Sequence, residues 1–401
     1  MPFDAFTIDT SVVAQGGYDF QAGLLAQLVQ FNGGPIRFVV SEIVVRETLR
    51  HLQADGKKAR DAVISALDRA VRAGVTTADV REATLGALED PRAVARARVA
   101  AFLEATGAET VPARLCTVDA LTKAYFDPAA PFEATGDKKR EFPDAIALLS
   151  LEEWARSSGR TVLAVSADKG WAAFAERSAH IVVESDLAAA LQAVQDHTDA
   201  VAKAVDGLLG RMERGEAAEL RSSVEDRLSG ALVEWEFEVE GYSQFRFEVE
   251  STELRLDGFR LLERPDGGYR AAVVRLAPEE TVVRVDAEVS ATASVGFSLY
   301  AWDSVDREEL GMGSTSAEVE ETFDAALLVT ILGPIEGPDE GLDIDVVEVV
   351  AGLGSVDVGE IEIDYRGDDF DDYEQLRLEL AEGDGDPAME VATAEGTDEV
   401  G

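Results

Sequence analysis

The hydrophobic pattern of this 401-residue chain changes its period near residue 231. Before that point, short apolar runs alternate with stretches of helical spacing, which predicts buried strands joined by helices. After it, apolar and polar residues alternate one by one, as in the stretch 283–301, which predicts strands with one buried face and one wet face. We therefore expect an α/β domain followed by an antiparallel all-β domain, a division that suits the length of the chain.

Five apolar runs in the first half have the length of buried strands, and helical segments separate them. They occupy residues 6–10, 37–41, 109–113, 161–165 and 180–185. Strands that alternate with helices form mostly parallel sheets, with right-handed crossovers and helices on both faces. The sequence thus predicts a Rossmann-like three-layer fold for residues 1–190.

Three further parts are expected after this domain. Residues 191–230 are predicted to form a helical connector, residues 231–366 an acidic domain resembling a β-sandwich, and residues 367–401 an acidic, partly disordered tail. The formal net charge is −43, and it is unevenly distributed. Residues 1–200 hold 21 basic and 28 acidic side chains, whereas residues 201–401 hold 15 and 51. This charge opposes non-specific binding to nucleic acid or anionic membrane but leaves room for a basic patch in the first half.

The cysteine and histidine content limits the kinds of site that are expected. Cys116 is the only cysteine, and the three histidines lie far apart, so we expect neither an internal disulfide nor a zinc site. The first residues lack the basic and apolar segments of a signal peptide, and no apolar run reaches the roughly 18 residues of a membrane span. We expect a cytoplasmic protein without a membrane segment.

Four carboxylates of the first half occupy positions from which they could meet. Asp9 and Asp168 each follow a strand at its carboxyl end, where ligands bind in open α/β sheets. Glu47 lies in the helix after the second strand. Asp144 follows Pro143 in the first turn of an apolar helix. Converging carboxylates repel one another unless divalent cations lie among them, and oxygen ligands suit Mg²⁺ or Mn²⁺. Two such ions are the usual arrangement for phosphodiester hydrolysis.

Each of three acids also has an ordinary structural interpretation. Asp144 could simply support the start of its helix, and Asp168 could cap the helix that follows it. Glu47 could form an exposed pair with Arg50 or His51. These alternatives stay open at the level of the sequence.

Four short motifs together resemble the PIN domain family of metal-dependent nucleases. They read IDTS from residue 8, VVRETLRHL from 44, KKREFPDAIALLSL from 138 and VLAVSADKGW from 162. They are most similar to a longer bacterial branch, which combines a Lys-Lys pair before an Asp-Ala helix with a Val-Ser-x-Asp-Lys strand end. The resemblance covers about residues 3–190, so residues 1–190 are expected to be a PIN-like nuclease domain.

The resemblance implies a role for each acid. Asp9 would be the first-strand acid, Glu47 the helix acid, Asp144 the second aspartate and Asp168 the acid after the fourth strand. Together these four residues would hold Mg²⁺ or Mn²⁺ and catalyse the hydrolysis of single-stranded RNA, with DNA as the alternative substrate.

Two positions depart from the family pattern. Ser11 stands where an asparagine is common, and its hydroxyl could still bond the first carboxylate. Gly170 stands where the branch often has a further acid. If that acid helps to hold a second metal, activity would need more Mn²⁺ or would be absent.

Basic and hydroxyl side chains near the acids complete the expected site. Lys138, Lys139 and Arg140 could hold a phosphate backbone, although such clusters often form a solvated loop. Ser11 and Ser166 are the remaining predicted substrate-binding residues. We expect Trp171 to belong to the core rather than to stack on a base.

The leading functional hypothesis is a metal-dependent endoribonuclease whose acidic β domain serves regulation or contact with an unknown protein partner. The alternative is a non-catalytic adaptor that keeps the PIN fold and acts through the β domain. Single-domain PIN toxins are much shorter than this chain. A phosphatase of the haloacid type is disfavoured because Ser11 stands where that class has its second aspartate.

Overall fold

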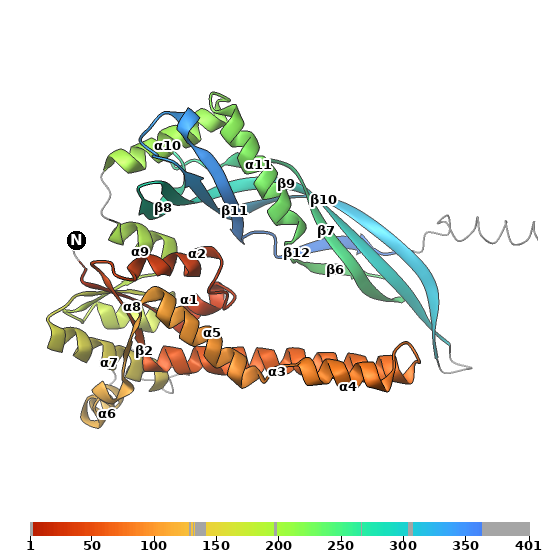
Figure 1. Ribbon diagram of the computed structural model, residues 1–401, viewed down its shortest axis with the longest axis horizontal. Helices are drawn as coiled ribbons and strands as arrows, with labels where there is room; N and C mark the ends of the chain where they lie inside the picture. Colours follow the sequence, from red (N-terminus) through yellow and green to blue (C-terminus); the bar gives the residue numbers. More distant parts are fainter. Residues whose placement is uncertain are drawn as a thin grey trace, which may run out of the picture. The chain divides into compact units, whose positions relative to one another are not determined.

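The computed structural model describes residues 3–127, 130, 132, 142–195, 199–265, 267–303 and 308–362 (Figure 1). The predicted phosphate-binding residues Lys138, Lys139 and Arg140 and the predicted acidic tail 367–401 lie outside these ranges. By its internal contacts the chain divides into two compact units. Unit 1 comprises residues 1–235, 254–291 and 321–353, and unit 2 comprises residues 236–253, 292–320 and 354–401. The domain boundaries expected at residues 190, 230 and 366 remain predictions.

Five short strands of unit 1 form one parallel sheet. Across the sheet they are β3 (Glu109–Val111), β2 (Arg37–Ser41), β1 (Ala5–Ile8), β4 (Val162–Val165) and β5 (Ile181–Glu184). Every pairing is parallel, and β1 lies in the centre with Ile8 beside Val165. This confirms the predicted α/β fold, and it brings the carboxyl ends of β1 and β4 together.

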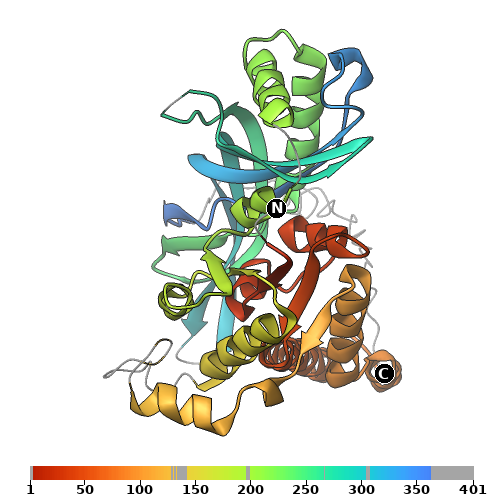
Figure 2. The same ribbon diagram turned by 90° about the vertical axis from the view of Figure 1, so that its left-hand side faces the viewer.

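Helices cover both faces of this sheet, as Figure 2 shows for α7 on one side and the red α1–α2 segment on the other. Successive residues of a strand point to opposite faces, so Ala5 joins the core under α7 (Phe142–Ser158) and Phe6 joins the core on the other side. The second core is completed by α1 (Thr10–Gln15), η1 (Gln27–Phe31) and α9 (Leu187–Val194). The remaining elements of this region are α2 (Gly23–Ala26), α5 (Pro91–Thr106), η2 (Ala113–Leu115), α6 (Val118–Phe126) and α8 (Lys169–Ala175).

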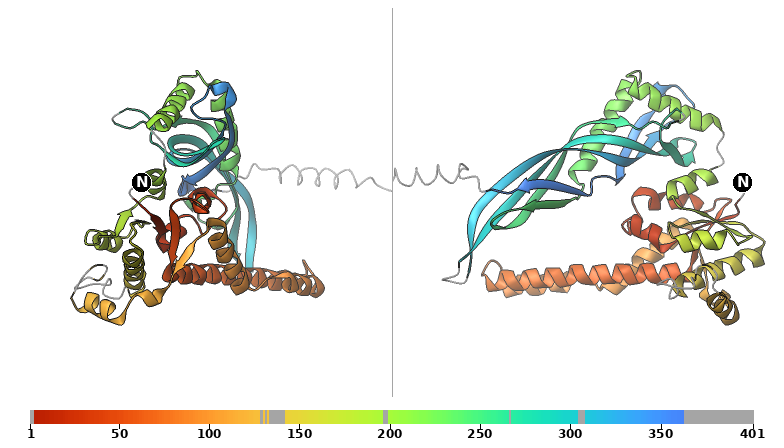
Figure 3. Two further views of the ribbon diagram at one scale, coloured as in Figure 1. Left: turned by 60° about the vertical axis from the view of Figure 1, so that its left-hand side comes forward. Right: turned by 180° about the vertical axis from the view of Figure 1, so that it is seen from behind.

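The helix after β2 is much longer than the sheet requires. Ser41 caps α3 (Glu42–Arg72) by accepting the N–H of Ile43. The buried residues of α3 end at Leu52, which packs on α5, so the outer part of the helix contributes nothing to the core. Figures 1 and 3 show α3 extending away from the parallel sheet, with α4 (Ala78–Ala87) folded back along its outer end.

A second sheet follows, as the alternating pattern predicts. Its main path runs β11 (Asp343–Ala351), β10 (Glu308–Leu332), β9 (Glu280–Asp303), β7 (Arg246–Leu261), and β8 (Ala271–Ala277) also pairs with β9. The β8–β9 and β10–β11 pairs are antiparallel, which confirms the predicted antiparallel sheet. The alternation from Val283 to Leu299 belongs to one continuous strand, β9. Every second residue between these two positions is apolar and buried.

Within unit 1, this second sheet has a different neighbour on each face. Side chains of α10 (Asp199–Glu213) and α11 (Ala218–Val233) pack on one face, where Leu209 and Val224 meet Val283. On the other face, Val274, Val282 and Leu328 are fully buried in the same core as Phe6 of β1. The two sheets of unit 1 therefore share one hydrophobic core.

Unit 2 contains residues 246–253 of β7, 292–303 of β9 and 308–320 of β10, together with a small additional sheet. The latter pairs β6 (Glu238–Tyr242) with β12 (Ser355–Glu360) in parallel. Phe237 and Val239 face Phe297 and Leu299 of β9 in a small core of their own. Within the described ranges, none of the helices combines the length and the hydropathy that crossing a bilayer requires.

Candidate active site

Asp9 lies at the carboxyl end of β1 and caps α1. The residue is only 6% exposed, and three donors hold its carboxylate. The N–H of Thr10 donates to Oδ1 at 2.6 Å, and the hydroxyls of Ser11 and Ser166 donate to Oδ2 at 2.7 and 3.0 Å. Ser166 follows β4, so the pairing of β1 with β4 delivers it to this point. The hydrogen bond expected from Ser11 is confirmed. Both serines, predicted to bind substrate, donate their hydroxyl protons to Asp9.

Glu47 is joined to this group through Thr10. The hydroxyl of Thr10 donates to Oε2 of Glu47 at 2.7 Å. Glu47 is half-buried on the second turn of α3, and among the described residues it forms no hydrogen bond or ion pair with Arg50 or His51. Its partner is thus the residue that follows Asp9, and the exposed-pair interpretation is wrong. Thr10 itself was not predicted to take part, although it stands inside the IDTS motif.

Asp168 is joined to the same group through Ser166. The hydroxyl of Ser166 accepts the N–H of Asp168 at 3.1 Å while it donates to Asp9. Asp168 also caps α8 by accepting the N–H of Gly170, so the structural role considered for it is real. Gly170 is buried at the position where a further acid would stand. The half-buried Asp168 therefore combines a capping role with a place in the acidic group.

Asp144 lies in the first turn of α7 and is held from α8. The indole Nε1–H of Trp171 donates to Oδ1 of Asp144 at 3.2 Å. The Trp171 side chain is fully buried, which confirms its expected place in the core. Because Asp168 caps the helix that carries Trp171, one short helix links the third and fourth acids.

The four acids reach this region from β1, α3, α7 and the end of β4. Carboxylates and hydroxyls offer only oxygen ligands, which fit a hard cation such as Mg²⁺ or Mn²⁺. In the part of the chain that the structure describes, no group of three or more histidine, cysteine, aspartate and glutamate side chains is arranged to hold a metal ion. The donor types fit a metal site. Hydroxyl groups of Thr10, Ser11 and Ser166 position three of the acids, and the indole of Trp171 holds the fourth, Asp144.

A fifth acid nearby, Glu42, has a separate role. It receives the N–H of Ala113 at 2.8 Å and pairs with Arg46 one turn along α3. The Ala113 N–H and the Arg46 guanidinium together hold the pKa of Glu42 below its usual range. Glu42 thus ties the start of α3 to η2.

Comparison with known proteins identifies the first region. The family model described as PIN domain matches residues 7–171. This part of the chain is a PIN domain. PIN domains are a family of nucleases that commonly bind divalent metals. One solved structure that matches is that of VapBC2 from Rickettsia felis bound to a DNA fragment from its promoter. The aligned residues are 11% identical, the TM-score is 0.24, and the match covers 45% of this chain and 97% of the chain in that structure. A TM-score of this size does not establish a common fold. No curated protein matches the chain.

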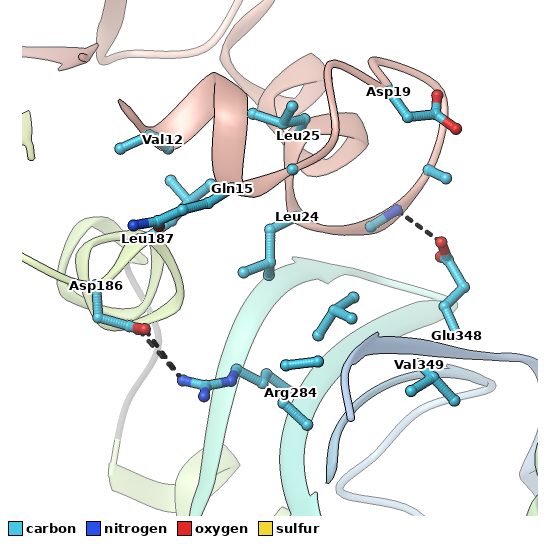
Figure 4. Close-up of a pocket in the computed structure, with 16 residues that line it drawn as sticks. Val12, Gln15, Asp19, Leu24, Leu25, Asp186, Leu187, Arg284, Glu348 and Val349 are labelled. Atoms are coloured by element: carbon cyan, nitrogen blue, oxygen red, sulfur yellow. Dashed lines mark hydrogen bonds and ion pairs between the residues drawn. The ribbon is translucent and has the colours of Figure 1, made fainter. Parts of the chain in front are cut away.

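A separate cavity of about 500 Å³ lies where the PIN domain meets the second sheet (Figure 4). On one side the Arg284 guanidinium bonds both carboxylate oxygens of Asp186, at 3.2 and 3.4 Å. On the other side the N–H of Gly23 donates to Oε2 of Glu348 at 2.6 Å. None of the four predicted acids lines this cavity, so it is distinct from the candidate active site.

Proposed function

We propose that the PIN domain hydrolyses phosphodiester bonds of single-stranded RNA as a metal-dependent endoribonuclease of the cytoplasm. Its catalytic residues are Asp9, Glu47, Asp144 and Asp168. One observation carries the proposal: hydrogen bonds through Thr10 and Ser166 connect three of these acids, which come from separate elements, at the carboxyl edge of β1 and β4. Asp9 and Glu47 are held by neutral donors and have no basic partner among the described residues, so a cation could serve as their counter-charge.

The four carboxylates would hold Mg²⁺ or Mn²⁺, which supplies an activated water and a stabilised leaving oxygen when bound. Other residues of the chain position these carboxylates. Ser11 and Ser166 fix the Oδ2 atom of Asp9, and Trp171 fixes one oxygen of Asp144. We therefore assign the two serines to positioning rather than to direct substrate contact. Lys138, Lys139 and Arg140 remain proposed phosphate ligands.

The experiment that tests this function is cleavage of labelled RNA and DNA of one sequence by wild type and by Asp144→Asn, with Mn²⁺, with Mg²⁺ and with EDTA. The matched control is Asp79→Asn, because Asp79 also lies in the first turn of a helix but far along the chain from the site. We expect metal-dependent cutting of RNA by wild type and by the control, and none by Asp144→Asn. Equal cutting by all three proteins would contradict the assignment.

A second candidate function is a non-catalytic adaptor. Gly170 favours it, because a buried glycine, whose N–H donates to the capping carboxylate of Asp168, occupies the place of a further acid. In that case the acidic β domain, which we propose to serve regulation or contact with a protein partner, would carry the activity. Absence of cutting with either metal, in a protein that still binds RNA or a partner, would favour the adaptor.

A further inference from the structure

One face of α3 continues outward from Glu47 and is basic. At 100° per residue, one exposed acid, Asp55, and four cationic or imidazole side chains lie within about 80° of Glu47 on this face. The latter four stand three, four, ten and eleven residues further on, and we call them the Glu47 face: Arg50, His51, Lys57 and Lys58. All four are exposed. The three cations of the face form no ion pair with any described residue, whereas other arginines of α3 and α4, such as Arg46 and Arg81, do.

The charge of this segment runs against that of the chain. Residues 43–60 hold five basic and two acidic side chains in a protein whose formal net charge is −43. Asp61, on the same face one turn beyond Lys57, limits the basic region at its outer end. A local positive surface attracts polyanions to one place, and the negative charge of the rest of the protein opposes their binding elsewhere.

An aromatic pair borders the Glu47 face. The rings of Tyr18 and His51 are stacked, with centroids 5.6 Å apart and planes at 26°. Tyr18 has φ +56°, a left-handed conformation that a bulky residue adopts only when its surroundings impose it. Arg98 donates to its carbonyl oxygen at 2.7 Å, which anchors the turn. The loop after α1 is thus fixed so that an aromatic surface lies one helical turn beyond Glu47.

We propose that the Glu47 face binds the single-stranded nucleic acid beyond the scissile phosphate. Arg50, Lys57 and Lys58 contact successive phosphates, and one base stacks on the pair formed by Tyr18 and His51. The helix rises about 16 Å between Glu47 and Lys58, enough for several nucleotides. This inference rests on the proposed function, which gives the location of the scissile bond. It predicts that long single-stranded nucleic acids bind more tightly than short ones.

The test is binding of a labelled 24-nucleotide RNA and a 6-nucleotide RNA to the full-length Asp144→Asn protein, measured by fluorescence anisotropy over a range of salt concentrations. We expect the added pair Lys57→Glu and Lys58→Glu to weaken binding of the long RNA about tenfold and to leave the short RNA almost unaffected. The slope of log K against log salt should fall by roughly 0.7 for each lost phosphate contact. DNA of the same sequence shows whether the face distinguishes the sugar.

The control pair is Arg92→Glu with Arg96→Glu, two exposed cations of α5 outside the Glu47 face. An equal loss of RNA affinity in the two double-substituted proteins would show that only net charge matters and would overturn the inference. For the aromatic pair, His51→Ala should weaken binding about fivefold or more, the lower limit for one stacked base, whereas His51→Phe should retain it. Equal effects of the two substitutions would remove the stacking role.

Cleavage separates this inference from the proposed function. If wild type cuts RNA and the substitutions Lys57→Glu and Lys58→Glu leave binding of long RNA unchanged, the proposed binding role of the Glu47 face is wrong and the proposed nuclease function is kept. If wild type cuts nothing but long RNA still requires Lys57 and Lys58, the face stands and the nuclease proposal fails.

Discussion

The hydroxyl of Thr10 donates a 2.7 Å hydrogen bond to Oε2 of Glu47, while the N–H of the same residue donates to Asp9. A single residue thus connects the carboxylate at the end of β1 to the carboxylate on α3. Neither acid has a basic partner among the described residues, so their relative position depends on neutral donors. Residues that carry no charge and touch no substrate can therefore control the proposed site.

The first prediction concerns Thr10. Thr10→Val keeps the shape of the side chain but removes the donor to Glu47, and we expect the cleavage rate to fall about tenfold or more. The free energy of unfolding should fall by only about 1 kcal/mol, because one partly buried hydrogen bond is lost. Thr10→Ser retains the hydroxyl and should keep most of the activity. Single-turnover cleavage and thermal unfolding measure the two effects. A fully active Thr10→Val protein would show that this bond does not position Glu47.

The second prediction concerns Trp171. Trp171→Phe removes the indole donor to Asp144 and leaves a small cavity, so we expect both cleavage and stability to fall, stability by about 1–3 kcal/mol. Trp154→Phe is a matched control, because its indole donates at the same 3.2 Å to Glu109, away from the acids. Trp154→Phe should lower the free energy of unfolding, and its cleavage rate should fall no further than this loss of stability explains. Similar activity losses in both proteins would attribute the effect to packing alone.

Parts of this site follow from the sequence for a simple reason. Asp9 and Asp168 each follow a buried run, and the carboxyl ends of neighbouring parallel strands meet at one edge. The bond from Ser11 to Asp9 was predictable because the two residues are close in the chain. The alternation from Val283 to Leu299 predicted a strand because its period of two is a local property.

The rest depends on contacts between distant segments. The bond between Thr10 and Glu47 requires α3 to begin directly after β2, and the bond between Trp171 and Asp144 spans 27 residues. No local pattern encodes either. For the same reason the sequence could not predict that Val282 and Leu328 are buried in the same core as Phe6: alternating residues show that a strand has an apolar face but not which element covers it.

The third prediction uses pH and the pair between Arg211 and Asp339, which joins α10 to the η4 turn (Asp339–Gly341). The two hydrogen bonds from Arg211 hold the pKa of Asp339 below its usual range. A depressed folded pKa stabilises the protein above the unfolded pKa of about 3.9 and ceases to do so as the pH falls through the folded value.

Both side chains of this pair are about one-third exposed, so solvent screening limits the effect. We expect Asp339→Asn to cost roughly 0.5–1 kcal/mol at pH 7. The difference from wild type should shrink below about pH 4. Asp345→Asn, an exposed acid of β11, serves as the control. Urea unfolding at several pH values gives the measurement. A difference that is the same at pH 3 and pH 7 would contradict the ion-pair explanation.

The fourth prediction concerns the metal. Mn²⁺ should raise the melting temperature of wild type, because a cation that binds only the folded state stabilises it by mass action and relieves carboxylate repulsion. Asp168→Asn should show a smaller rise. Asp186→Asn is the control, because Asp186 also follows a strand and caps the next helix, but it lies at the separate cavity. An equal rise in the Asp168→Asn protein would remove this residue from the proposed metal site.

The fifth prediction follows from the core that the two sheets of unit 1 share. Leu328→Ala leaves a cavity in the core that also contains Phe6 of β1, and we expect it to cost about 2–5 kcal/mol and to speed amide hydrogen exchange in β1 as well as in β10. Leu310→Ala, at a 45% exposed position of the same strand, should change neither. Faster exchange confined to β10 would show that the sheets unfold independently. Exchange that rises in both means that the PIN domain needs the second sheet to remain folded, so a chain cut at residue 200 would lose activity through instability.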